Sequence, residues 1–424
     1  MILSSIDSLK GLTKDGRLLF ATRGIRLFAY GFLSVVLILY LTSAGLSEVQ
    51  AGAVLTFTLI GDAAVTFWIT THADRTGRRR MLVVAALLMA AAGVVFTLTH
   101  NFLLLLLAAT VGVISPSGNE VGPFLSIEQA SLSHLTPEDT RTGVFSWYNL
   151  VGSFATALGA VSGGWLAQAL QSSGWTPVSS YRVVIVGYAL IALVLVASFS
   201  RLSPAVEVNA ASKENPSSGG STGSWLGLGA SRGKVLRLAL LFSLDAFAGG
   251  FVIQSLVAYW FHTRFGLAPG VIGSIFFGAN ILAGISALSA AWIASRIGLV
   301  NTMVFTHLPS NVLLILVPLM PTLPLAVTML LLRFSISQMD VPTRQSYVMA
   351  VVAREERSAA SGITTIARSI GASLAPVLTG PLLAVPALSG VPFLISGGLK
   401  IVYDLILYRN FRGIKPPEEA ASRD

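Results

Sequence analysis

The string His72-Ala73-Asp74-Arg75-Thr76-Gly77-Arg78-Arg79-Arg80 separates two apolar segments, near residues 51–71 and 81–99. Each segment has about 20 residues, the length that an α-helix needs to cross the hydrocarbon core of a bilayer. A short turn between antiparallel helices needs a residue that tolerates positive φ, and Gly77 supplies it. Asp74 can bond backbone N–H groups or pair with a nearby arginine, while arginines favour the inner membrane surface. The string predicts a basic turn between two membrane spans, although a loop that only sets orientation would have the same composition.

The composition of the whole chain excludes a water-soluble fold. Of the 424 residues, 54% are hydrophobic and 11% are charged, and the mean hydropathy is +0.75. Soluble domains average about 25% charged residues, and even large ones leave about a quarter of their surface exposed. The net charge of +9 is explained by basic cytoplasmic loops, so we expect no nucleic-acid partner. The absence of cysteine excludes disulfides and thiolate metal sites.

Apolar runs between polar breaks predict an all-α integral membrane protein with twelve transmembrane helices. The predicted spans are 18–42, 51–71, 81–99, 102–131, 142–168, 181–200, 235–261, 270–292, 301–320, 324–351, 358–384 and 388–408.

Basic residues gather in alternate loops, which predicts the orientation of the chain in the membrane. They lie before the first span, after the second, after the sixth and in the tail, whereas the other loops have only Arg182 and Arg264 near their ends. Positive loops stay on the inner side, so both termini and the central loop are predicted to be cytoplasmic. The protein is therefore expected in the cell membrane, which is the inner membrane in a bacterium.

The chain divides near its middle into two halves that repeat each other. Residues 1–200 form the first predicted half, 201–234 have linker composition, and 235–424 form the second half with a cytoplasmic tail. At a constant offset of 221, Ser34 meets Ser255 and Gly77 meets Gly298. We therefore predict two pseudo-symmetric six-helix halves, an arrangement found in one class of secondary transporter.

The basic turn resembles the signature of the major facilitator superfamily (MFS) between its second and third helices. Asp74, Arg75, Gly77, Arg78 and the two arginines that follow fit that signature, and Thr70 stands where its first glycine belongs. The resemblance implies the MFS fold and transport by alternating access, with this loop as a gate. It also implies a solute transporter embedded in lipid, expected to act as a monomer and to need no cofactor besides a proton gradient.

A second, weaker resemblance bears on the direction of transport. Gly159-Ala160-Val161-Ser162-Gly163-Gly164 is similar to a signature of the family's antiporters, but Ala160 replaces its proline. This implies a drug/proton antiporter-like branch and efflux. Close packing of small residues explains the same glycines without any bearing on direction.

Ionisable residues within the spans are candidates for proton coupling, because each costs about 2.5–3.5 kcal/mol to insert and should face a cavity or a partner. Asp245 lies mid-way along its span with no cation beside it in sequence, so a lone carboxyl in an apolar place is expected to load and release a proton. A fixed counter-ion for a distant arginine, such as Arg26 or Arg368, is the alternative. Asp62 and Glu120 are further proton candidates.

The tenth predicted span carries the richest polar stripe. Arg333, Ser337, Asp340 and Arg344 share one helical face, and Pro342 should bend or open the helix there. These residues line a transport path or form a structural ion-pair network. The fourth span is interrupted by glycines and prolines around Asn119, which also points to a binding site. The remaining substrate-path candidates are Gln254, Arg26 and Arg368.

Motifs for other functions are missing from the sequence. The string nearest to a phosphate-binding loop, 229–235, has the wrong spacing and final residue, and no hydrolase or metalloprotease motif occurs, so we expect no enzyme. The first hypothesis is proton-coupled export of small organic, amphipathic molecules. The second is an importer or facilitator of a polar or anionic solute, with the arginines as anion contacts. A membrane sensor or channel is the third.

Overall fold

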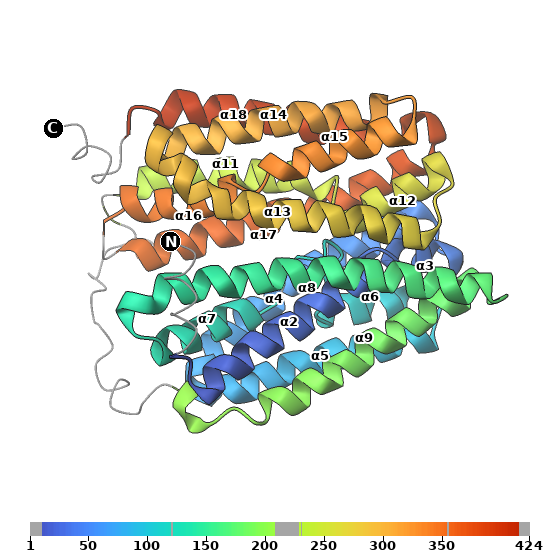
Figure 1. Cartoon of the computed structure of the whole chain (residues 1–424), viewed down its shortest axis with the longest axis horizontal. Helices are drawn as coiled ribbons and strands as arrows, with labels where there is room; N and C mark the ends of the chain where they lie inside the picture. Colours follow the sequence, from blue (N-terminus) through green and yellow to red (C-terminus); the bar gives the residue numbers. More distant parts are fainter. Residues whose placement is uncertain (1–10, 120–121, 208–228, 230, 354–355, 415–424) are drawn as a thin grey trace. The chain divides into compact units, whose positions relative to one another are not determined.

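The structure is a computed structural model that describes residues 11–119, 122–207, 229, 231–353 and 356–414, shown in Figure 1. Within these residues the secondary structure is entirely helical. Ten of the described helical segments are long and apolar enough to cross a membrane. Two further segments, each broken into a helix pair, complete the twelve predicted spans. Large apolar side chains such as Leu98 and Leu240 are 79% and 73% exposed, as expected for a surface that faces lipid.

The described chain forms two compact units. The first unit holds the described residues up to 207 together with 253–281. Most of the predicted linker 201–234 lies outside the described residues. The elements of the first unit are α2 (Lys14–Ser34), α3 (Leu37–Ser43), α4 (Glu48–Thr76), α5 (Arg78–Leu98), α6 (Phe102–Val111), α7 (Phe124–Leu135), α8 (Glu138–Ser172), α9 (Pro177–Phe199), η1 (Pro204–Val206), α12 (Gln254–Phe265) and the start of α13 (Pro269–Ile297).

The second unit holds the described residues from 229 to 252 and from 282 onward. Its elements are α11 (Arg232–Gly250), the rest of α13, α14 (Leu299–Leu319), α15 (Leu323–Ile336), α16 (Asp340–Val351), α17 (Arg357–Ala384), η3 (Pro386–Leu388) and α18 (Val391–Phe411).

Helix breaks occur at corresponding spans of the two halves. The fourth span stops at Val111 and resumes at Phe124, because the intervening residues include two prolines and two glycines with positive φ, Gly118 and Gly122. The tenth span stops at Ile336 and resumes at Asp340, just ahead of Pro342. The first and seventh spans are also interrupted, between α2 and α3 and between α11 and α12. The breaks predicted in spans four and ten are confirmed, whereas those in the first and seventh spans were not predicted.

Glycines set the closest helix contacts within each unit. A Cβ on Gly159 of α8 would lie 2.0 Å from the carbonyl oxygen of Phe28 on α2. A Cβ on Gly371 of α17 would lie 2.2 Å from the carbonyl oxygen of Ser243 on α11. The first and fifth spans of each half therefore approach each other backbone to backbone, as small residues allow in membrane proteins.

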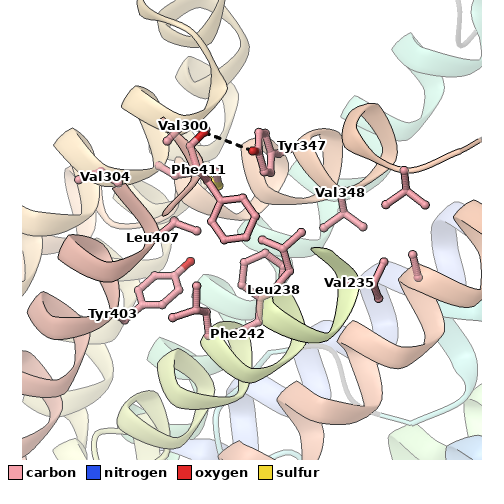
Figure 2. Close-up of a cluster of buried hydrophobic side chains, with 14 residues drawn as sticks. Val235, Leu238, Phe242, Val300, Val304, Tyr347, Val348, Tyr403, Leu407 and Phe411 are labelled. Atoms are coloured by element: carbon pink, nitrogen blue, oxygen red, sulfur yellow. Dashed lines mark hydrogen bonds between the residues drawn. The ribbon is translucent and has the colours of Figure 1, made fainter. Parts of the chain in front are cut away.

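An apolar cluster fills one part of the second unit (Figure 2). It joins α11, α14, α16, α17 and α18 through buried side chains, and the Tyr347 hydroxyl donates to the carbonyl oxygen of Phe411. Phe242 and Tyr403 pack edge to face in this cluster. One helical turn beyond Phe242 on α11 lies Asp245, so the apolar cluster adjoins the charged residues described next.

Candidate functional site

Asp245 is surrounded by basic side chains from four different helices. Lys400 Nζ on α18 lies 2.5 Å from Asp245 Oδ1, and His307 Nε2 on α14 lies 3.9 Å from the same oxygen. Arg344 on α16 and Arg368 on α17 each place Nη1 near Asp245 Oδ2, at 3.3 and 3.1 Å. Only 5% of the Asp245 side chain is exposed. The carboxylate thus joins α11 to four other spans of the second unit.

A second set of acids surrounds these bases. Asp340 Oδ2 lies 2.7 Å from Arg344 Nη1, and Asp404 Oδ1 lies 2.9 Å from His307 Nδ1. Asn311 also donates to Asp404, at 2.9 Å. We call these contacting residues, together with Arg333, which lies within electrostatic range of Asp245 and Asp340, the charge cluster. It comprises Asp245, His307, Arg333, Asp340, Arg344, Arg368, Lys400 and Asp404.

Positive charge is in excess in the charge cluster. Among the residues that the structure describes there, three arginines and Lys400 face three aspartates, and His307 can add another positive charge. Arg333 lies within electrostatic range of Asp245 and Asp340, yet its buried Nε has no hydrogen-bond partner in the described part of the chain. The buried hydroxyl of Ser337, one turn after Arg333 at the end of α15, also has no hydrogen-bond partner among the described residues. The cluster therefore holds donors that its own carboxylates do not satisfy.

The corresponding spans of the first half hold a simpler pair. Arg26 on α2 donates two hydrogen bonds of 2.7 Å, one to each carboxylate oxygen of Glu128 on α7. Thr22 donates to one of those oxygens and Tyr148 on α8 to the other. Both charged side chains are fully buried. This is a closed bidentate pair, the geometry in which an arginine and a carboxylate satisfy each other.

The basic turn takes the shape that its sequence predicts. Helix α4 ends at Thr76, and Gly77 adopts φ 110° before α5 begins. Arg75 is exposed, and the Asp74 side chain lies outside what the structure describes. Glu207, which the sequence did not single out, accepts hydrogen bonds from the backbone N–H groups of Arg78 and Arg79 at 2.6 and 3.2 Å. This carboxylate caps the positive end of α5.

A family model described as Major Facilitator Superfamily matches residues 19–421, nearly the whole chain. The chain belongs to that superfamily. It is also 30% identical to the uncharacterized membrane protein YJR124C of Saccharomyces cerevisiae, over 96% of each chain. The superfamily member is thus a multi-pass membrane transporter and not an enzyme.

Solved transporter structures share the fold. A point mutant of the nucleoside transporter NupG matches with a TM-score of 0.74 at 14% identity, over 94% of this chain and all of that one. A D-xylose-proton symporter matches with a TM-score of 0.70 at 17% identity, over 93% and 97% of the two chains. A bacterial homolog of the human lysosomal transporter Spinster, inward-facing and occupied, matches with a TM-score of 0.68 at 17% identity, over 94% and 97%.

The expected surroundings of Asp245 need correction. From its sequence neighbours we expected a lone carboxyl in an apolar place, but the structure gives it Lys400, Arg344 and Arg368 as partners. Arg368 was one of the two distant arginines named as alternatives for its counter-ion. The other, Arg26, binds Glu128 instead. Sequence reading failed here because the partners come from three other spans, and local sequence carries no signal of them.

The structure brings together most of the stripe predicted on the tenth span. Asp340 and Arg344 pair as expected, and Arg333 and Ser337 lie on the preceding helix α15 and at its end. Three further members, His307, Lys400 and Asp404, were not selected from the sequence. Lys400 binds Asp245, and Asp404 binds His307. Their position within apolar spans was the signal that could have placed them in the site.

The remaining candidates lie in the first unit. Gln254 donates to the Ser34 hydroxyl at 2.7 Å and accepts from Asn280 at 3.3 Å. Asp62 is partly buried in α4, and Asn119 has an exposed side chain in the break of the fourth span. Glu120 lies outside the described residues. The described positions among these do not join the charge cluster.

Proposed function

We propose that this superfamily member is a secondary active transporter working by alternating access, in which Asp245 links the movement of a small organic solute to that of a proton. The single observation that supports this role is the set of contacts to Asp245 from α14, α16, α17 and α18. Alternating access changes the distances between spans, so it changes the charges around this carboxylate. Without nearby cations, a carboxyl in an apolar medium favours its neutral, protonated form. Asp245 therefore takes up a proton when its basic partners move away and releases it when they come back into contact.

Two other carboxyls are secondary proton candidates. Asp62 lies in α4, and Glu120 was chosen from the sequence alone. The feature that favours Asp245 over both is its set of charged contacts from several spans at once.

Export remains the direction that we propose to test first, with import of a polar or anionic solute as the second candidate. The antiporter-like glycines give less support to export than the sequence suggested, because Gly159 and Gly163 of α8 make backbone contacts with α2. Antiport is therefore a prediction that rests on resemblance. A structural neighbour that is a D-xylose-proton symporter supports proton coupling on this fold, and at 17% identity it does not transfer a sugar substrate.

Purified protein in proteoliposomes tests the proton link. A solute that raises the melting temperature of the purified protein is chosen first. An imposed proton gradient should then drive its accumulation, and Asp245→Asn should abolish that drive while exchange of labelled for unlabelled solute continues. Glu48→Gln, an acid that accepts from Tyr259 outside the charge cluster, is the matched control. Proton-driven accumulation that persists in Asp245→Asn would remove Asp245 from the mechanism, and transport without saturation would indicate a channel.

We also propose that the basic turn is a gate on the cytoplasmic side. Asp74→Ala should lower the turnover rate several-fold while the solute affinity changes little, because the turn controls opening and does not touch solute. A loss of affinity with an intact rate would contradict the gate. The natural chain has no cysteine, so Arg75→Cys alone reports the side of the membrane through a membrane-impermeant maleimide. Labelling from outside in intact cells would contradict the proposed orientation.

A further inference from the structure

We infer that the solute is a small organic anion, and that it binds by taking the place of the Asp245 carboxylate on Arg344 and Arg368 while Asp245 accepts a proton. This inference rests on the proposed role of Asp245 and adds to it the chemical class of the solute and the order of partners. The anion exchanges its contacts with water for contacts with the guanidinium groups of Arg344 and Arg368. The proton that comes from solution ends on a carboxylate oxygen of Asp245.

The first support is the surplus of cationic donors in the charge cluster. A buried charge is costly unless a partner of opposite sign compensates it. Within the described residues of the cluster, three arginines and Lys400 share three aspartates, and the buried Nε of Arg333 has no acceptor there. A bound anion would supply acceptors for these unsatisfied donors, whether or not Asp245 is protonated. The hydroxyl of Ser337, likewise without a partner among the described residues, offers a further donor to the anion.

The second support is the chemistry of the donors. Arginine presents a planar fork that matches the oxygens of a carboxylate or phosphate, and two arginines already bind the same oxygen of Asp245. A solute carboxylate can therefore reproduce the contacts that Asp245 makes. Arg368 has 33% of its side chain exposed, whereas Arg344 and Asp245 have 7% and 5%. Arg368 is thus the guanidinium that an incoming anion meets first.

The exchange leaves the charge of the cluster unchanged. Asp245 faces Lys400 of α18, Arg344 of α16, Arg368 of α17 and His307 of α14. Asp340 and Asp404 hold Arg344 and His307 from the other side. An arriving anion adds one negative charge, and protonation of Asp245 removes one. Proton and anion therefore bind together, and the loaded cluster is as well compensated as the empty one. A transporter that loads both together is a symporter, so this inference favours the second candidate direction, import of an anionic solute, over antiport.

Binding to the purified, full-length protein tests this inference. The probes are lactate with lactamide, benzoate with benzamide, and glycerol 3-phosphate with glycerol, and the readout is the melting temperature as a function of probe concentration. We expect at least one anion to stabilise the protein while its neutral counterpart does not. Arg368→Gln should weaken binding of that anion at least tenfold, and Arg368→Lys should restore part of the affinity. Arg264→Gln, at an exposed arginine of α12 outside the charge cluster, should leave the affinity unchanged.

The pH dependence tests the exchange of partners. A carboxylate probe that stays ionised between pH 6 and pH 8 should bind more tightly at pH 6, because Asp245 must take a proton. In Asp245→Asn the probe should bind at least tenfold more tightly at pH 8, and the pH dependence should disappear, since no carboxylate competes for the guanidinium groups.

The outcomes separate this inference from the proposed function. Equal stabilisation by a neutral counterpart, an unaffected Arg368→Gln variant, or no stabilisation by any anion would overturn the anionic solute, even where Asp245 still couples transport to protons. Anion binding that depends on Arg368 but has the same affinity at both pH values would overturn the exchange and the role of Asp245 with it.

Discussion

Two buried charged groups, one in each half, stand on corresponding spans with the positions of acid and base exchanged. In the first half the cation Arg26 is on the first span and the acid Glu128 on the fourth. In the second half the acid Asp245 is on the seventh span and the cation Arg344 on the tenth. The third partner also corresponds, with Tyr148 on the fifth span and Arg368 on the eleventh, although only the latter is charged.

The difference between the two groups lies in whether their donors are satisfied. The Arg26–Glu128 pair is bidentate, fully buried and supported by two hydroxyl groups, so a solute would have to break it in order to bind there. The charge cluster has more cations than carboxylates among its described residues, and it includes a partly exposed arginine. Like positions in a repeated fold thus serve two purposes. A closed pair holds helices together, and an open cluster of surplus charge is suited to bind and exchange ions.

Removal of one member of the closed pair should have the largest effect on stability. Arg26→Met should lower the free energy of unfolding by about 3–5 kcal/mol, because it leaves the Glu128 charge buried without a cation. The double variant Arg26→Met/Glu128→Met should recover most of that loss. Denaturation of the purified protein in detergent measures both. A single variant as stable as the natural chain would show that the pair is not closed in the way described.

Removal of the acid at the centre of the charge cluster should lower the stability less, and added anions should restore part of the stability that is lost. Asp245→Asn should lower the free energy of unfolding by about 3 kcal/mol, the low end of the cost of leaving a buried charge without its partner, because Arg344 keeps Asp340 and Arg368 is partly exposed. An anion that binds the cluster should stabilise Asp245→Asn more than it stabilises Glu128→Gln, because in Glu128→Gln the Asp245 carboxylate still competes for Arg344 and Arg368. Melting temperatures measured with and without the anion give the answer. An equal rise in melting temperature of both variants on adding the anion would contradict the distinction between the closed pair and the charge cluster.

Two glutamates that accept from backbone N–H groups near helix starts, one in each half, should contribute similarly to stability, in contrast to the two buried charged groups. Glu207 accepts from the backbone N–H groups of Arg78 and Arg79 ahead of α5, and Glu356 accepts from those of Gly229 and Ser231 ahead of α11. Loss of a capping acceptor costs about 0.5–2 kcal/mol. Glu207→Ala and Glu356→Ala should each lower stability within that range in the same unfolding assay. A much larger loss of stability in one of these variants would show that the two halves also differ in their helix caps.

Several features of the site were predictable because they depend on local sequence. Pro342 and the glycine- and proline-rich stretch of the fourth span marked the helix breaks, and the spacing of Asp340 and Arg344 predicted their ion pair. Gly77 was chosen for its freedom at positive φ, which the structure confirms. The interruption of the seventh span after Gly250 was not predicted.

The sequence by itself determined the number of spans, the repeat and the class of protein, because hydrophobic length and periodicity are properties of short segments. Only the tertiary structure decided which buried charges meet. The three cations that bind Asp245 lie 99, 123 and 155 residues away along the chain. An apolar medium forces every charge to find a partner, but the packing of whole helices chooses which one. For that reason the two similar halves contain one closed ion pair and one cluster with an excess of positive charge.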